Sequence, residues 1–211
     1  MKNTEEIIRR AVCLLCFSDR CFLEKDIIDG IQHTLDEREE QRKLIRKWLI
    51  EKNYYDYLSK KEKMIIDLPV VERKNIMVLA EANDYECIEP LLWSVGLVPE
   101  LSSYDYYVVE DLHPILKIGR DHSLKEIVDS CKPLSSDLIE TKRELAMLWY
   151  QQSLECHNHS NDINSDLRVK GKKLSTLSNK KLAELTMYSK KRFHAFEWMC
   201  SNDDWKNVNL D

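Results

Sequence analysis

The chain has 211 residues, of which 43% are hydrophobic and 33% charged, and its formal net charge at pH 7 is -5. With only 4 Gly and 5 Pro, it has little material for the turns of a β-barrel or for a glycine-rich phosphate loop. Leu, Lys, Glu and Ile favour helices, so the composition predicts one all-α, globular domain over residues 1–211 with about seven to nine helices.

The composition also indicates a compartment. The segment MKNTEEIIRR is charged where a signal peptide would be apolar, and no apolar run approaches the roughly 20 residues of a membrane span. The 7 cysteines are scattered and odd in number, which argues against a disulfide framework. We therefore expect a cytoplasmic protein without membrane contact.

Helices with N-terminal capping boxes are predicted in the first part of the chain. Asn3 with Glu6 forms the first box, and its helix is expected to end at Cys21. Ser59 with Glu62 forms another box, heading a short helix. Further helical segments are predicted over residues 23–32, 34–52 and 71–82.

The stretch Asn83–Asp105 holds the densest apolar run and is predicted to build much of the core. Its apolar residues recur at helical spacing, namely Ile88, Leu91, Leu92 and Val95. Asn83 with Glu86 resembles a capping box, but Pro90 is awkward past a first turn, so the helix either starts near Glu86 or bends. Gly96 is predicted to be the left-handed residue that ends the helix.

The second half of the chain is predicted to end in two long helices, at residues 136–156 and 179–200. The first should turn Leu138, Ile139, Leu145, Leu148 and Trp149 inward. Residues 104–109 have strand-like propensity without a partner strand, so we expect an ordered crossing segment. Residues 157–178 are polar and predict a long mobile loop, and residues 201–211 form a tail with enough apolar surface to dock on the body.

Four pieces of the sequence, in this order, resemble the mainly bacterial domain-of-unknown-function family 4272. They are EEIIRRAVCLLC, IEPLLWSVGLVPELSSYD, KRELAMLWY and RFHAFEWM followed by DWKNV. The second piece, with its W-x-x-G-L ending, is the most specific. The resemblance implies a fold class but no activity, cofactor or partner. The family pattern commonly has an arginine one turn before Trp149; Ala146 stands there, and the nearest arginine is Arg143.

Two groups of metal-binding residue types occur, and both have a plainer explanation. Cys13 and Cys16 form a C-x-x-C pair on one helix face, but no second ligand pair exists, so core packing is the preferred interpretation. Cys156, His157 and His159 cluster where a helix meets the polar loop, and a solvent-exposed loop is preferred there. We therefore predict no metal, no cofactor and no catalytic residue.

The basic segment 168–192 carries nine Lys and Arg against Glu184, a net +8, so the remainder of the chain carries -13 (-5 minus +8). Such a segment could follow a phosphate backbone. Because the whole chain is acidic and no nucleic-acid motif is present, a solvated arm or one lying on an acidic body is preferred, and nucleic-acid binding is not expected.

The leading functional hypothesis is a non-enzymatic helical protein that binds another protein or a second copy of itself. The basis is negative, since helices and charges abound and no catalytic motif occurs. The alternative is a small-ligand-binding or enzymatic domain with a polar pocket drawn from distant helices, lined by several of Glu86, Asp105, Glu110, His113, Arg143 and Arg192. The third is nucleic-acid binding through residues 168–192. The candidate binding residues are Trp93, Arg143, Trp149, Arg192 and Trp198, although core packing is the more common role of such tryptophans.

Overall fold

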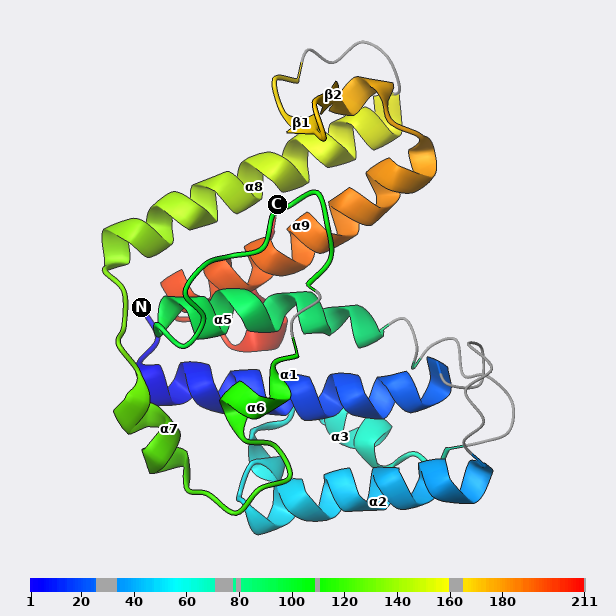
Figure 1. Cartoon of the computed structure of the whole chain (residues 1–211), viewed down its shortest axis with the longest axis vertical. Helices are drawn as coiled ribbons and strands as arrows, with labels where there is room; N and C mark the ends of the chain where they lie inside the picture. Colours follow the sequence, from blue (N-terminus) through cyan, green and yellow to red (C-terminus); the bar gives the residue numbers. More distant parts are fainter. Residues whose placement is uncertain (26–33, 71–77, 79–80, 109–110, 160–164, 211) are drawn as a thin grey trace. The chain divides into compact units, whose positions relative to one another are not determined.

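The computed structural model describes residues 1–25, 34–70, 78, 81–108, 111–159 and 165–210 (Figure 1). These residues contain eight α-helices and one two-stranded sheet, which confirms the predicted all-α class. Contacts divide the chain into two compact units. Unit 1 comprises Met1–Lys2, Glu89–Glu110 and Lys132–Asp211, and unit 2 comprises Asn3–Ile88 and Asp111–Cys131.

Unit 2 begins with the long helix α1 and contains most of the shorter helices. Its elements are α1 (Thr4–Lys25), α2 (Leu35–Glu51), η1 (Tyr55–Tyr57), α3 (Lys60–Asp67), η2 (Glu81–Cys87), α6 (His113–Leu116) and α7 (Leu124–Ser130). The two predicted capping boxes are confirmed, and Thr34 with Glu37 forms a third at the start of α2. The helices predicted over 23–32 and 71–82 fall largely outside the described residues.

Buried arginines connect the helices of unit 2. The guanidinium of Arg10 on α1 binds both carboxylate oxygens of Glu62 on α3. Arg20, also on α1, pairs with Glu24 at 3.1 Å and donates to the carbonyl oxygen of Leu68 at 2.8 Å. Because these charges are removed from water, the bonds to the carboxylates and to the Leu68 carbonyl offset part of the free energy that their burial costs.

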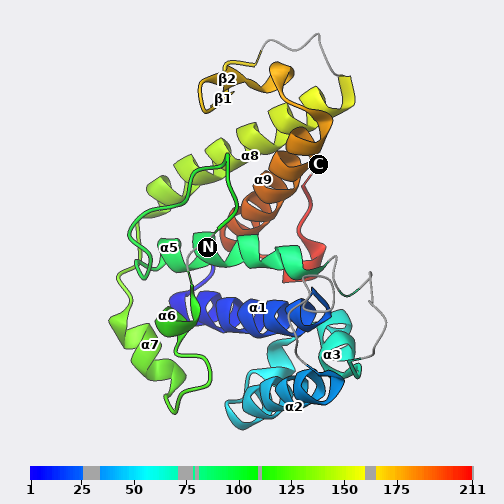
Figure 2. The same cartoon turned by 45° about the vertical axis from the view of Figure 1, so that its right-hand side comes forward.

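Unit 1 is built on the antiparallel pair of long helices α8 and α9, which lie side by side in Figures 1 and 2. Its elements are α5 (Ile88–Ser94, all but its first residue), α8 (Ser136–His159), β1 (Arg168–Val169), β2 (Lys172–Lys173), η3 (Leu174–Thr176), α9 (Asn179–Cys200) and η4 (Trp205–Asn207). Helix α9 has the predicted bounds, whereas α8 continues past Cys156. Leu138 and Leu148, predicted to face inward, are exposed.

The apolar stretch 83–105 forms a shorter helix than its capping signal indicated. A 3-10 segment precedes α5, and α5 starts at Ile88, so Pro90 lies in its first turn, where a proline is tolerated. Gly96 ends the helix with φ +74° in a Schellman motif, because its N–H donates to Trp93 and the N–H of Leu97 donates to Leu92. The prediction for Gly96 is confirmed.

Part of the predicted loop 157–178 has regular structure. Strands β1 and β2 form an antiparallel hairpin, and Val169 and Leu174 bury their side chains beside Cys156, Leu182 and Leu185. Residues 160–164 lie outside the described set. In the tail, the ring of Trp205 lies 5.3 Å from that of Trp198, measured between centroids.

Candidate functional site

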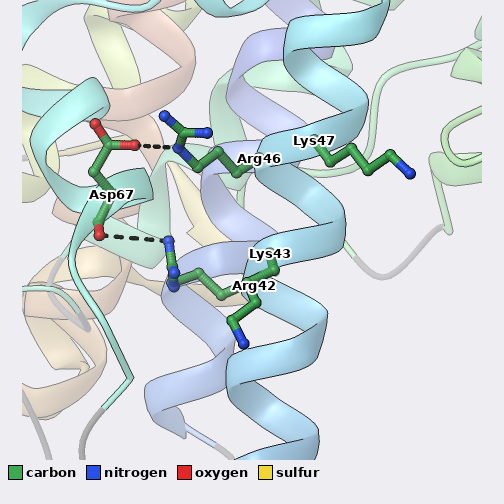
Figure 3. Close-up of a pocket in the computed structure, with 5 residues that line it drawn as sticks. All are labelled: Arg42, Lys43, Arg46, Lys47 and Asp67. Atoms are coloured by element: carbon green, nitrogen blue, oxygen red, sulfur yellow. Dashed lines mark hydrogen bonds and ion pairs between the residues drawn. The ribbon is translucent and has the colours of Figure 1, made fainter.

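Two pockets lie in unit 2. The first has a volume of about 370 Å³ and follows the exposed side of α2 (Figure 3). It is lined by Arg42, Lys43, Arg46, Lys47 and Asp67. Four cations around one carboxylate suggest an anion site. Whether they could bind an anion depends on whether each cation already has a partner in the protein.

The arginines of this first pocket are already engaged. Arg42 donates to both oxygens of Glu39, at 2.9 and 2.7 Å, and Figure 3 shows its guanidinium directed at the backbone of Asp67. Arg46 donates from Nε to the Asp67 carboxylate at 2.7 Å. The bond from Arg42 lowers the pKa of Glu39 to about 2.

The lysines are paired too, Lys43 with Glu40 at 2.7 Å and Lys47 with Glu51 at 3.7 Å. Each cation of the pocket therefore has a carboxylate within ion-pair distance. The first pocket is an ionic lattice that holds α2 to the end of α3, and it offers an anion little uncompensated charge.

The second pocket, called here the Tyr54 pocket, has a volume of about 290 Å³. It is formed where α1, the end of α2 and the start of α7 meet. Its lining residues are Arg9, Glu51, Lys52, Asn53, Tyr54, His122, Ser123 and Leu124. The volume lies at the lower end of the range for small-molecule sites.

A helix-ending motif places Tyr54 at this pocket. Asn53 has φ +59°, and its N–H donates to the carbonyl of Ile50, while the N–H of Tyr54 donates to that of Leu49 at 2.8 Å. This is a Schellman motif, in which the residue after the left-handed position packs back on the helix. The ring of Tyr54 accordingly stacks on that of Trp48 at 5.6 Å and is 1% exposed.

His122 lies just before the N-cap of α7 and has a defined tautomer. Its Nδ1 is 3.2 Å from the carbonyl oxygen of Arg120, and since a carbonyl only accepts, Nδ1 carries the proton. Burial holds the pKa of His122 below its usual value, which favours the neutral ring. The Nε2 atom of the neutral ring is then a lone-pair acceptor, and the ring lies 5.9 Å from Trp48.

Three polar atoms around Trp48 are buried without a hydrogen-bond partner among the described residues: Tyr54 Oη, His122 Nε2 and Trp48 Nε1. Burial raises the pKa of Tyr54 to about 12, so its hydroxyl stays protonated and can donate. Leaving a buried polar atom unpaired costs about 1–3 kcal/mol. Unpaired acceptor and donor groups therefore occur together beside a ligand-sized pocket.

The charges at the rim of the Tyr54 pocket are balanced. Arg9 pairs with Glu5 at 2.6 Å, and Lys52 pairs with Asp121 at 2.6 Å. Glu51 pairs with Lys47, as described above. The unpaired buried atoms of residues that line the pocket, Tyr54 Oη and His122 Nε2, thus belong to neutral groups.

The site residues predicted from the sequence all belong to unit 1, and two of them meet at Tyr104. Trp149 stacks on the Tyr104 ring at 5.7 Å, and the guanidinium of Arg192 lies 5.3 Å from the same ring. Arg192 is 1% exposed and donates to the carbonyl oxygens of Ser102, Ser103 and Tyr106 at 2.8–3.0 Å. These contacts fix the crossing segment to α9.

The other three predicted residues are separate from this contact. Trp93 meets Phe196 edge-on, and Trp198 meets Trp205. Arg143 forms ion pairs with Glu140 and Glu197, and Ala146 is fully buried. A binding role for these residues stays a prediction.

The polar residues suggested for an assembled pocket are divided between the two units. Glu86 and His113 belong to unit 2, whereas Asp105, Arg143 and Arg192 belong to unit 1. Glu110 lies outside the described residues, and none of the others lines either pocket described above. His113 instead bridges Asp19 and Asp111, at 2.9 and 2.7 Å.

The candidate metal ligands lie on two different helices, α1 and α8. Cys13 and Cys16 are buried on α1, and burial raises the pKa of Cys13 to about 12, which disfavours the thiolate. Cys156 is also buried and lies on the last turns of α8 rather than in a loop. The side chain of His159 lies outside the described set. Elsewhere in the described chain, no three His, Cys, Asp or Glu side chains gather closely enough to hold a metal ion.

Tyr54 and His122 were not predicted from the sequence. Asn53 after a helical segment is a signal for a left-handed helix end, and it could have placed Tyr54 against α2. No local signal distinguishes His122. Among the described helices, none has an apolar stretch of the length needed to cross a membrane.

The fold and the pocket define an all-helical protein with a ligand-sized polar pocket in one of two compact units. The chain belongs to the family described as Domain of unknown function (DUF4272), whose sequence model matches residues 1–208. This confirms the resemblance noted in the sequence. Comparisons with curated proteins and with solved structures found no match.

Proposed function

We propose that this protein binds a small, uncharged polar molecule in the Tyr54 pocket. One observation carries the proposal: two residues that line the pocket each have a buried polar atom without a partner in the described chain, Tyr54 Oη and His122 Nε2. Folded proteins pair the large majority of such buried side-chain atoms. A ligand that supplies the missing partners recovers the free energy lost by burying them.

The two atoms set the hydrogen-bonding character of the ligand. His122 Nε2 accepts, so the ligand provides an N–H or O–H donor. The Tyr54 hydroxyl donates, so the ligand also provides an acceptor. Amides, lactams and alcohols meet both requirements, and the volume of about 290 Å³ corresponds to roughly ten water molecules.

The balanced rim explains why the ligand is neutral. A carboxylate would have to displace an existing partner, such as Asp121 from Lys52 or Glu5 from Arg9, and an ammonium group would have to displace Lys47 from Glu51. The displaced side chain would then lose its own ion pair. A neutral molecule avoids this exchange, because it bonds only to groups that are still unpaired.

The test is ligand-observed NMR with a library of small neutral amides, lactams and alcohols, run on the wild-type chain and on two single-hydroxyl variants. Tyr54→Phe removes the unpaired hydroxyl, while Tyr55→Phe removes a neighbouring hydroxyl that bonds to Asp67 at 2.6 Å and does not line the pocket. We expect wild-type binders to weaken at least about tenfold with Tyr54→Phe, the effect of one hydrogen bond, and to be unchanged with Tyr55→Phe. Equal binding to both variants, or a library without binders, contradicts the proposal.

A further inference from the structure

The hairpin at the junction of α8 and α9 carries a concentrated positive charge. Strands β1 and β2 pair Arg168 with Lys173 and Val169 with Lys172. The two loop residues, Lys170 and Gly171, have φ +49° and +80°, the left-handed values of a type I′ turn. We call the segment Arg168–Lys173 the basic hairpin; its position beside both helices is visible in Figure 1.

The basic hairpin is anchored, so its cations are held in place. Val169 is buried, and Leu174, the next residue after β2, is buried with it against Leu182 and Leu185. The cationic residues before, in and after the turn are exposed or partly exposed, namely Arg168, Lys170, Lys172 and Lys173. The apolar side holds the hairpin on unit 1 and leaves the charged side to solvent.

The cationic residues of the basic hairpin differ from those of both pockets in their pairing. No carboxylate of the described chain pairs with any of its four cationic residues. Arg168 and Lys173 are direct cross-strand neighbours, and like charges in that position destabilise a hairpin. A negatively charged partner would attract both side chains and so offset the repulsion between them.

The distribution of charge in the sequence indicates which anion fits. Outside residues 168–192 the chain carries -13, so the net negative charge of the protein disfavours a long polyanion. A short acidic segment interacts only with the hairpin, because charges farther away than about 8–10 Å are screened at physiological salt. The sequence from Ser165 to Met187 also has no aromatic residue on which a nucleic-acid base could stack.

We propose that the basic hairpin docks an acidic segment of a partner protein. This site is independent of the Tyr54 pocket. The test is fluorescence anisotropy with a labelled twelve-residue peptide of alternating Glu and Ser, beside a labelled single-stranded DNA of equal charge. The proteins are the wild type, the double variant Lys170→Asn/Lys172→Gln and the control Lys60→Gln/Lys206→Gln. Asn tolerates the positive φ of position 170, and the control removes the same net charge at exposed positions.

We expect the peptide to bind the wild type more tightly than the DNA does, and to bind the hairpin variant about five- to tenfold more weakly, the sum of two exposed ion pairs. The control should bind as the wild type does. Thermal unfolding of the variants separates lost binding from lost folding. DNA binding as tight as the peptide, equal loss in both double variants, or no peptide binding in low salt overturns the proposal.

Discussion

Buried polar groups in the two units differ in how completely they are paired. In unit 1, Arg192 donates to three backbone carbonyls and lies over the ring of Tyr104. In unit 2, Tyr54 Oη and His122 Nε2 are as deeply enclosed but have no partner in the described chain. Unit 1 also has two unpaired oxygens, Glu89 Oε2 and Tyr104 Oη, but neither residue lines a described pocket.

The difference separates structural from functional polarity. A buried cation that meets its acceptors stabilises the segment it holds, because its removal leaves those acceptors unpaired. An unpaired group lowers stability and persists where it serves another purpose, and strained or unsatisfied groups concentrate at functional sites. The contacts of Arg192 are those of a structural clasp, and its binding role stays a prediction, whereas the Tyr54 pocket has the features of a site.

The largest expected effect comes from breaking the clasp. Arg192→Met keeps much of the side-chain volume but leaves the carbonyls of Ser102, Ser103 and Tyr106 unpaired, so the free energy of unfolding should fall by about 3–5 kcal/mol. Urea unfolding measures it. Lys190→Met on the same helix is the control; its exposed ammonium only lies over Tyr150, so the loss should stay below about 1 kcal/mol. Equal losses would show that Arg192 is no clasp.

The substitution Gly96→Ala measures how much stability unit 1 loses when only the backbone conformation and its closest contact are disturbed. A Cβ at this position would lie 2.4 Å from the carbonyl oxygen of Lys132, and the backbone has φ +74°. Gly96→Ala should therefore cost about 2–4 kcal/mol, from the left-handed conformation and the contact together. Gly171→Ala shares the positive φ but has nothing within 4 Å, so its cost should be about 1 kcal/mol. Similar costs for the two substitutions would exclude the contact with Lys132 as the cause.

Local signals in the sequence account for most of the fold and for little of the pocket. The bounds of α9, the caps at Asn3 and Ser59 and the helix end at Gly96 depend on neighbouring residues, and these predictions are confirmed. For α5, the structure agrees with one of the two predicted alternatives, a helix that starts near Glu86: the α-helix begins at Ile88, after a 3-10 segment that contains Asn83. His122 approaches Trp48 only through tertiary packing, and no periodicity encodes that distance.

Most core substitutions lower the free energy of unfolding, but Tyr54→Phe should raise it. Removing an unpaired buried hydroxyl while keeping the ring on Trp48 should stabilise the protein by about 1 kcal/mol. For a chain of this length that corresponds to a rise of about 2–4 °C in Tm. Tyr55→Phe, which breaks the bond to Asp67, should be neutral or destabilising. Differential scanning calorimetry decides; a loss above about 1 kcal/mol in Tyr54→Phe would falsify the unpaired state.

Two histidines of unit 2, the paired His113 and His122 with its unpaired Nε2, should differ in how their contributions to stability depend on pH. His113 bonds to Asp19 and Asp111, chiefly through Asp19, and its pKa is raised to about 9. This folded-state pKa lies above the unfolded value near 6.5, so the stabilisation is complete below pH 6.5 and disappears as pH rises through about 9. His122 has a lowered pKa, so its contribution is present above the unfolded pKa and disappears as pH falls through the folded one.

Because the His113 side chain is 40% exposed, solvent screening reduces its stabilising contribution to about 1 kcal/mol. An imidazole ¹H–¹⁵N NMR titration should show His113 changing charge near pH 9 and His122 below its usual range. Urea unfolding at pH 6 and pH 10 should differ less in His113→Gln than in the wild type, since only the wild type loses the bridge to Asp19. If both histidines titrate near pH 6.5, then neither the pairing of His113 with Asp19 and Asp111 nor the burial of His122 holds in solution.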